Sequence, residues 1–129
     1  MDIGKQVDYW EKSAEHDLDT AKSLMKSKKF DWALFMGHLV LEKILKAIYV
    51  KKKETFPPKT HNLLLLIKEI EIQISEEDSD FFEEVNTFNI STRYPDDQLK
   101  FYQLCTKEFT REKFEKIKEK YKWLKKEVK

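Results

Sequence analysis

Residues 31–52 read DWALFMGHLVLEKILKAIYVKK, and they form the most apolar long stretch of the sequence. The stretch holds one glycine and no proline, so it predicts a long α-helix. A helix that is apolar on most of its faces lies in the middle of a bundle, or it faces both a core and a partner subunit. Pro57 and Pro58 cannot continue a helix, so this one ends before them.

Weaker signals on both sides of this helix predict four more. Apolar residues recur every three or four positions through two other long segments, which is the spacing of one helix face. Thr60 or Asn62 can cap a short helix, and the acids after Ser75 suit the start of another. Residues 94–104 fit either a loop or a helix that begins at Asp96. The helices expected are residues 7–26, 31–52, a short one that starts after Thr60 or Asn62 and reaches Ile70 or Ile74, one from Ser75 to Arg93, and residues 106–127.

These elements define the expected fold class. No stretch alternates over the length of a strand, and 129 residues fit one domain. Because the connections are short, we expect an all-α domain over residues 1–129, built as an up-and-down antiparallel bundle of about five helices.

Composition restricts the compartment and the chemistry. No apolar run approaches the ~20 residues that a membrane span needs, and the first residues do not resemble a secretory signal. The single cysteine, Cys105, cannot form an internal disulfide, which suits a reducing compartment. We therefore expect a cytoplasmic protein without membrane contact. No group of residues has metal-binding spacing and no glycine-rich phosphate loop is present, so we expect no metal and no cofactor.

Charge is unevenly distributed along the chain. Residues 61–99 carry 2 basic and 10 acidic side chains, whereas residues 100–129 carry 11 basic and 5 acidic ones. The two segments can form opposite faces, or they can pack together and neutralise each other. We favour neutralisation, so composition alone gives no case for nucleic-acid binding.

Charged residues also interrupt the most apolar helix. Glu42 and Lys46 are four residues apart and can pair across one turn, which is usually a solvated contact. If Glu42, Lys43 and Lys46 are buried, they need partners or a functional reason. His38, on the same apolar helix, is best interpreted as a core histidine that is hydrogen-bonded locally.

Two polar motifs lie outside that helix. His61, before the short helix, can form a local hydrogen bond, or it can act as a general base if a partner faces it. Arg93 can bind a phosphate or carboxylate in bidentate fashion, and Tyr94 can stack on a base. Alternatively, Arg93 pairs with Asp96 or Asp97 and fixes the loop.

Taken in order, these motifs resemble the HEPN family (higher eukaryotes and prokaryotes nucleotide-binding). The resemblance covers about residues 7–125 and rests on Trp10 with DLDTA at 17–21, Phe30 and Ala33, EKILKA at 42–47, PKTHNL at 58–63 and RYPD at 93–96. It implies a helical bundle that is usually a homodimer.

The resemblance implies two kinds of activity. One branch of the family comprises metal-independent ribonucleases, often toxins, in which a histidine follows an arginine after a few residues. Here no histidine follows Arg93, and the last one in the sequence is His61. The chain therefore resembles the branch that binds nucleotides or partners a minimal nucleotidyltransferase, as in toxin–antitoxin-like systems.

Three hypotheses follow. The first is a non-catalytic, homodimeric module that binds a nucleotide or RNA, or a nucleotidyltransferase, and it expects its ligand-binding residues to converge: Arg93, Tyr94, Asp96, His61, Lys43, Lys46 and Glu42. The second is a ribonuclease with a non-standard site, in which His61 faces Arg93. The third is a purely structural interaction protein, in which Arg93, Glu42 and Lys46 are consumed in internal ion pairs.

Overall fold

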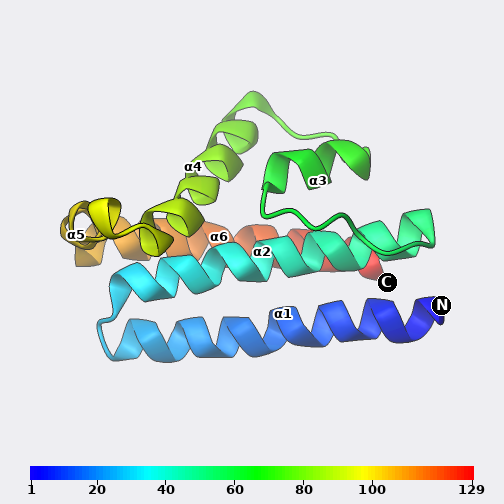
Figure 1. Ribbon diagram of the computed structural model, residues 1–129, viewed down its shortest axis with the longest axis horizontal. Coiled ribbons are helices and arrows are strands. Elements are labelled where there is room, and N and C mark those ends of the chain that lie inside the picture. The colour runs from blue at the N-terminus through cyan, green and yellow to red at the C-terminus, as the bar shows by residue number, and fades with distance from the viewer.

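The computed structural model describes all residues, 1–129, and contains helices and no strands (Figure 1). The helices are α1 (Ile3–Lys26), α2 (Phe30–Lys53), α3 (Leu63–Glu69), α4 (Glu76–Arg93), α5 (Pro95–Leu104) and α6 (Lys107–Val128). The expected all-α bundle is confirmed. There are six helices where about five were expected, because residues 95–104 form a helix of their own. Its Pro95 occupies the first turn and two acids follow, which are favourable at a helix N-terminus.

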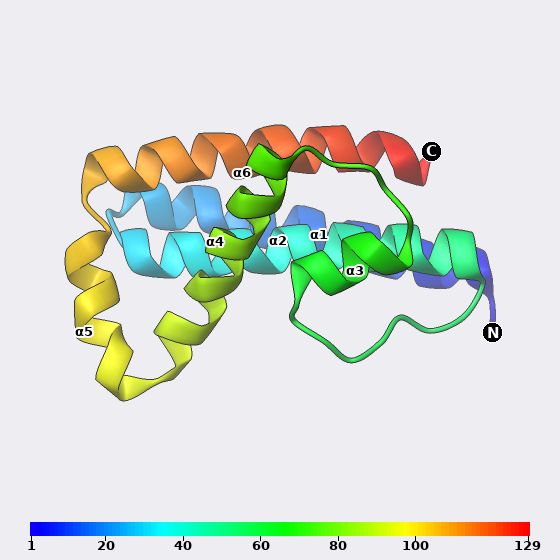
Figure 2. The ribbon, with the colours of Figure 1, turned by 90° about the horizontal axis from the view of Figure 1, so that it is seen from above.

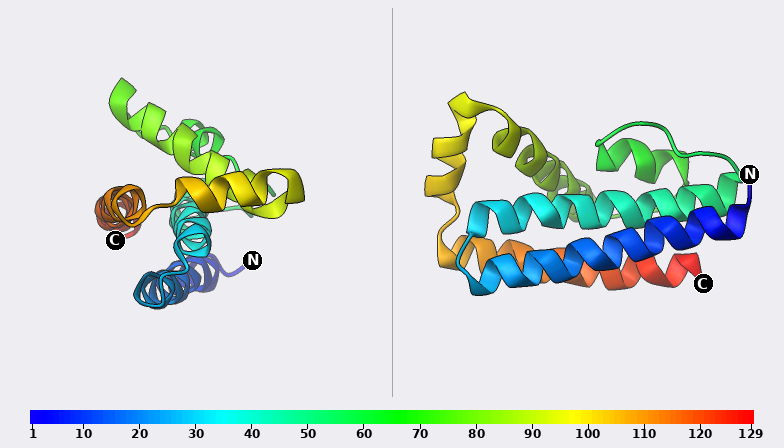
Figure 3. Two further views of the ribbon diagram at one scale, coloured as in Figure 1. Left: turned by 90° about the vertical axis from the view of Figure 1, so that its left-hand side faces the viewer. Right: turned by 60° about the horizontal axis from the view of Figure 1, so that its bottom comes forward.

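The three long helices, α1, α2 and α6, lie side by side (Figures 1 and 3). Helices α1 and α2 form an antiparallel hairpin, as an up-and-down bundle requires. Helix α6 runs in the same direction as α2, because the intervening segment returns the chain to the end at which α2 begins. Within that segment α4 crosses α2 obliquely and α5 forms a corner (Figure 2).

Helix α2 is the centre of the fold. It packs against α1, α3, α4, α5 and α6, and Figure 3 shows it surrounded by them in the end view. Helices of the same chain therefore bury most of its apolar side chains, while Trp32 is 47% exposed and Phe35 and Leu39 on the same stripe are half-buried. Gly37 permits the close approach of α6, since a Cβ there would lie 2.8 Å from Cδ1 of Ile117.

The acidic start of α4 lies against the lysines of α6. Lysine ammonium groups and carboxylates meet at 2.9 Å, 3.8 Å and 2.8 Å in the pairs Lys113–Glu84, Lys116–Glu77 and Lys120–Asp78. The expected neutralisation of the two oppositely charged segments is confirmed at these contacts.

None of the helices is both long and apolar enough to cross a membrane. The structure contains no cluster of three or more His, Cys, Asp or Glu residues that could hold a metal ion.

Candidate functional site

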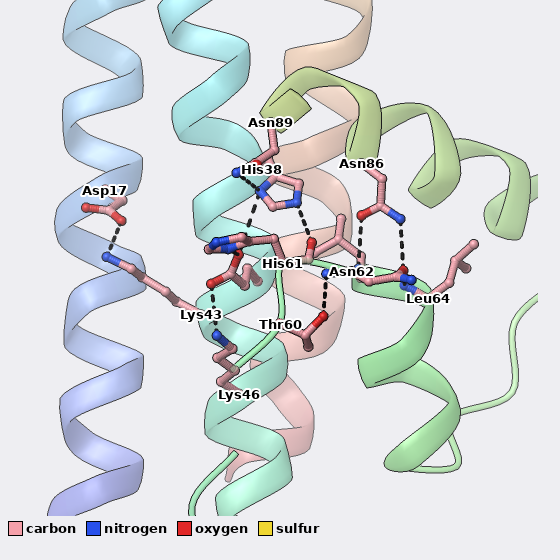
Figure 4. Close-up of polar contacts among 12 residues, drawn as sticks. Asp17, His38, Lys43, Lys46, Thr60, His61, Asn62, Leu64, Asn86 and Asn89 are labelled. Atoms are coloured by element: carbon pink, nitrogen blue, oxygen red, sulfur yellow. Dashed lines mark hydrogen bonds and ion pairs between the residues drawn. The ribbon is translucent and has the colours of Figure 1, made fainter. Parts of the chain in front are cut away.

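The buried carboxylate of Glu42 is hydrogen-bonded to both Lys46 and His61, the two side chains that Figure 4 labels beside it. It is only 4% exposed, and its Oε2 accepts a hydrogen bond from the ammonium of Lys46 at 3.0 Å. Lys46 is 6% exposed, and its Nζ lies 5.3 Å from the ring centroid of Trp10 on α1. The i, i+4 pair is thus a core contact. Because each buried charge needs the other, removing one of them is costly.

The second oxygen of Glu42 faces His61. Its Oε1 lies 2.8 Å from Nδ1 of the imidazole. An ionised carboxylate only accepts, so Nδ1 carries the proton and donates it. The opposite nitrogen, Nε2, has no partner in the protein, and the His61 side chain is 54% exposed. The Glu42 carboxylate therefore orients the imidazole, and Nε2 stays unpaired on a half-exposed side chain.

The loop before α3 sets the position of His61. The Thr60 N–H donates to the Pro58 carbonyl at 2.9 Å. Asn62 is the N-cap of α3, because its side-chain oxygen accepts from the N–H groups of Leu64 and Leu65. His61 is consequently fixed between a rigid approach and a capped helix.

His38, one turn before Glu42 on α2, connects the loop to α4. It is fully buried, and its Nε2 lies 2.8 Å from the carbonyl oxygen of His61, so Nε2 donates. Its Nδ1 lies 3.4 Å from the amide nitrogen of Asn89 on α4. Burial lowers the pKa of His38, and the nearby Glu42 carboxylate opposes that shift without cancelling it. The interpretation of His38 as a hydrogen-bonded core histidine is confirmed.

A pocket of about 200 Å³ opens beside these groups. It is lined by His61, Asn62, Asn86, Asn89 and Ile90. Asn86 joins α4 to the start of α3, since its oxygen accepts from the Leu63 N–H at 2.9 Å and its amide donates to Asn62 at 3.0 Å. The pocket is therefore built from three asparagine amides, one imidazole and one aliphatic side chain.

Sequence analysis did not identify Asn86 and Asn89. One signal was present: Asn89 falls on the buried stripe of α4, one turn after Val85 and beside Phe88. A buried asparagine among apolar residues needs hydrogen-bond partners, so it marks a polar contact within the core.

Lys43 does not join this cluster. Its ammonium lies 2.6 Å from Oδ2 of Asp17 on α1, on the other side of α2 from His61 (Figure 4). Glu42, Lys46 and His61 converge around one carboxylate, whereas Lys43 connects the two long helices of the hairpin.

Arg93, Tyr94 and Asp96 lie at the corner between α4 and α5, and all three are exposed. The Arg93 guanidinium lies 5.9 Å from the ring centroid of Phe35 and forms no ion pair, so the alternative of a salt bridge to Asp96 or Asp97 is not realised. Because Arg93 comes four residues after Asn89, it lies one turn beyond the pocket on the same face of α4.

Comparison with known families decides the family of this fold. The profile of the HEPN domain matches residues 7–128. The chain belongs to the HEPN family. No curated protein and no solved structure matches it. In this HEPN domain, three of the motifs quoted above fall into two places: EKILKA and PKTHNL meet at Glu42, and RYPD lies at the end of α4.

Proposed function

We propose that this HEPN domain is a non-catalytic module that binds a nucleotide along α4. The observation that carries the proposal is a pocket of about 200 Å³, lined by amides and an imidazole, one helical turn from an arginine that has no acidic partner. An amide-lined pocket offers hydrogen bonds to a base or a sugar, whereas an unpaired guanidinium offers a bidentate contact to phosphate.

The surroundings of Arg93 support this assignment. Stacking against the Phe35 ring orients the guanidinium without neutralising it. Tyr94 is 58% exposed and provides a surface for stacking beside it. Lys46 and Glu42 act from within the protein in this proposal, since both are buried and position His61.

The two arginines of the chain allow a matched test. Arg93→Ala is expected to weaken nucleotide binding about 10-fold or more, because a hydrogen bond to a charged group is lost. Arg111→Ala, on α6, is expected to leave binding unchanged. Isothermal titration calorimetry with mononucleotides measures both, and thermal unfolding checks that the variants stay folded. Equal effects of the two substitutions would remove Arg93 from the site, and no binding by the unaltered protein would favour the purely structural hypothesis.

Self-association is the second part of the proposal. Helix α2 supplies little of the argument for it, because helices of the same chain bury most of its apolar side chains and Trp32 is its one large exposed apolar residue. Exposed apolar side chains lie instead on α5, at Leu99, Tyr102 and Leu104, apart from the residues assigned to the nucleotide. Exposed patches of this kind mark protein interfaces. We propose that this face forms the homodimer or contacts a nucleotidyltransferase partner.

Sedimentation tests the dimer directly. The double substitution Leu99→Lys and Tyr102→Lys is expected to give a monomer. The control, Tyr9→Lys with Phe56→Lys, changes apolar residues of similar exposure elsewhere and is expected to leave the assembly intact. A monomeric unaltered protein at micromolar concentration would contradict the homodimer and leave only the partner protein.

One observation favours the ribonuclease as a second candidate. The Glu42 carboxylate holds Nδ1 of His61 and leaves Nε2 free at the surface, which is the geometry of a general base. In that reaction Nε2 would take the proton of an RNA 2′-hydroxyl, the 2′-oxygen would attack phosphorus, and the 5′-oxygen would leave with a proton from a general acid. Cleavage of RNA in EDTA, lost in His61→Asn, would establish it. Absence of cleavage would leave the binding module.

A further inference from the structure

We propose that a basic pocket at the α1–α2 turn binds backbone phosphates of a single-stranded nucleic acid. The inference rests on the proposed nucleotide site along α4 and names its ligand class, an oligonucleotide whose strand continues beyond the nucleotide bound there. The pocket has a volume of about 310 Å³. Its lining residues are Met25, Lys26, Lys28, Phe30, Lys107 and Arg111.

The charge of this basic pocket is unbalanced. Four of its lining residues are cationic and none is acidic. All four cationic side chains are exposed, and none of them forms an ion pair. Other lysines of α6 do have acidic partners, such as Lys120, whose ammonium lies 2.8 Å from the Asp78 carboxylate. The four cations of the pocket are therefore free to bind an anion.

Three segments of the chain bring these cations together. Lys26 lies in the last turn of α1 and Lys28 in the turn that follows it. Lys107 and Arg111 are one helical turn apart at the start of α6. Like charges that are brought together raise the free energy of the folded protein, and a phosphate bound between them lowers it. The arrangement therefore favours an anionic ligand.

The acids nearest to these cations on α6 lie on another side. Glu108, Glu112 and Glu115 line an adjacent pocket, which shares Lys107 and Arg111 with the basic pocket. Positive charge is thus concentrated on the side of α6 that faces the end of α1. Lys107 is also the first residue of α6, where the helix dipole favours acidic side chains over basic ones. Helix stability alone does not explain a lysine at that position.

The basic pocket lies at the same end of the molecule as Arg93. Figures 1 and 3 show the α1–α2 turn, α5 and the start of α6 together at that end. Arg93 comes just before α5 and Lys107 just after it. The 10 residues of α5 span about 15 Å, and a stacked strand carries one phosphate every ~3.4 Å. A strand of about five nucleotides therefore reaches from one site to the other.

A nucleic acid suits both sites better than an acidic protein or a membrane does. Its phosphates fit the cations, while a base can stack on Tyr94. An acidic peptide offers carboxylates but no base for the site on α4. A membrane surface requires apolar side chains that can insert, whereas Met25 and Phe30, the two apolar residues of the basic pocket, are partly buried against the core.

The salt dependence of binding tests the proposal. Fluorescence anisotropy with a labelled single-stranded RNA of about eight nucleotides, which covers both sites, gives the affinity at several salt concentrations. Each phosphate contact that is lost reduces the slope of log affinity against log salt concentration by about 0.7. Lys28→Ala combined with Arg111→Ala is therefore expected to weaken RNA binding and to reduce the slope by about 1.4. Calorimetry with AMP, which is too short to reach the basic pocket, should show unchanged binding in this variant.

Lys5→Ala combined with Lys53→Ala is the matched control. Both lysines are exposed and form no ion pair, and they lie at the opposite end of the molecule, at the start of α1 and the end of α2 (Figure 1). The control removes the same net charge, so its slope should equal that of the unaltered protein. Equal slopes for the two double variants would overturn the inference. Thermal unfolding checks that both are folded.

AMP separates the failure of this inference from the failure of the proposed function. If AMP binds and the RNA binds no more tightly than AMP, the inference is wrong and the nucleotide site on α4 stands. If neither AMP nor the RNA binds, the proposed function fails and the inference fails with it. A polyglutamate peptide that competes with the RNA as well as unlabelled RNA does would also overturn the assignment, because the surface would then bind any polyanion.

Discussion

Lys46→Met tests the buried charge pair most directly. Methionine keeps the length of the side chain against Trp10 but removes the ammonium 3.0 Å from Glu42. Glu42, 4% exposed, is then left with Nδ1 of His61 at 2.8 Å and Nδ1 of His38 at 3.9 Å from its Oε1. Removing one member of a buried pair costs about 3–5 kcal/mol, and the remaining bond to His61 places the expected loss near the lower limit, about 3 kcal/mol.

The same chain provides the matched control. Lys12 and Asp8 on α1 form an i, i+4 pair at 2.9 Å, with side chains that are 76% and 54% exposed. Lys12→Met removes the same charge from a pair with the same spacing, but this pair is exposed to solvent. We therefore expect no measurable change in the free energy of unfolding. Burial is the only large difference between the two substitutions.

Urea unfolding followed by circular dichroism measures both variants. For a domain of this size, a loss of about 3 kcal/mol lowers the melting temperature by roughly 10 °C. Adding Glu42→Gln to Lys46→Met is expected to restore part of the stability, because the neutral amide no longer needs the ammonium. If Lys46→Met costs no more than Lys12→Met, the pair is not the buried contact described above.

Three further predictions concern single positions. Gly37→Ala is expected to lower the free energy of unfolding in urea by about 1–3 kcal/mol, because the alanine Cβ would displace Ile117. Adding Ile117→Val should restore part of that stability. If it restores none, the close approach of α6 to α2 at Gly37 is contradicted. Because burial lowers the pKa of His38, the unfolded chain binds a proton below pH ~6.5 that the folded chain does not. The free energy of unfolding, measured in urea at a series of pH values, should therefore decrease as the pH falls through that value. The decrease should be less steep in His38→Gln. Burial raises the pKa of Cys105 to about 12, so the thiol should react slowly with a disulfide reagent at pH 8 in the native protein and rapidly in urea; equal rates would contradict its burial.

The helices were predictable because their signals are local. Apolar side chains that recur every three or four residues mark α1 and α6. The prolines after α2 and the serine before α4 mark helix ends within a few residues. The corner at α5 was ambiguous, since proline followed by two acids suits either a turn or a first helical turn. The direction of α6 depends on how the segment before it crosses α2, and no local pattern records that.

The candidate site was predictable only in part. Glu42, Lys46 and His61 stood out as polar residues in unusual positions, but their meeting at one carboxylate brings together residues 19 apart in the sequence. Lys43, like Lys46, is a charged residue in an apolar helix, yet its ammonium pairs with Asp17 on α1. The two lysines are three positions apart, so they project from α2 in different directions and meet different neighbours. Asn89 meets His38 only in the folded chain, because the two residues are 51 apart in the sequence.

The central position of α2 has a consequence during synthesis. The apolar helix is complete at residue 53, while α6, which covers one of its faces, is complete only at residue 128. At a translation rate of about 5–20 residues per second, that face of α2 stays exposed for roughly 4–15 s before α6 has been synthesised. During this interval the nascent α1–α2 hairpin exposes an apolar surface that chaperones can bind. Completion of α6 therefore ends the interval in which this face of α2 is open to aggregation.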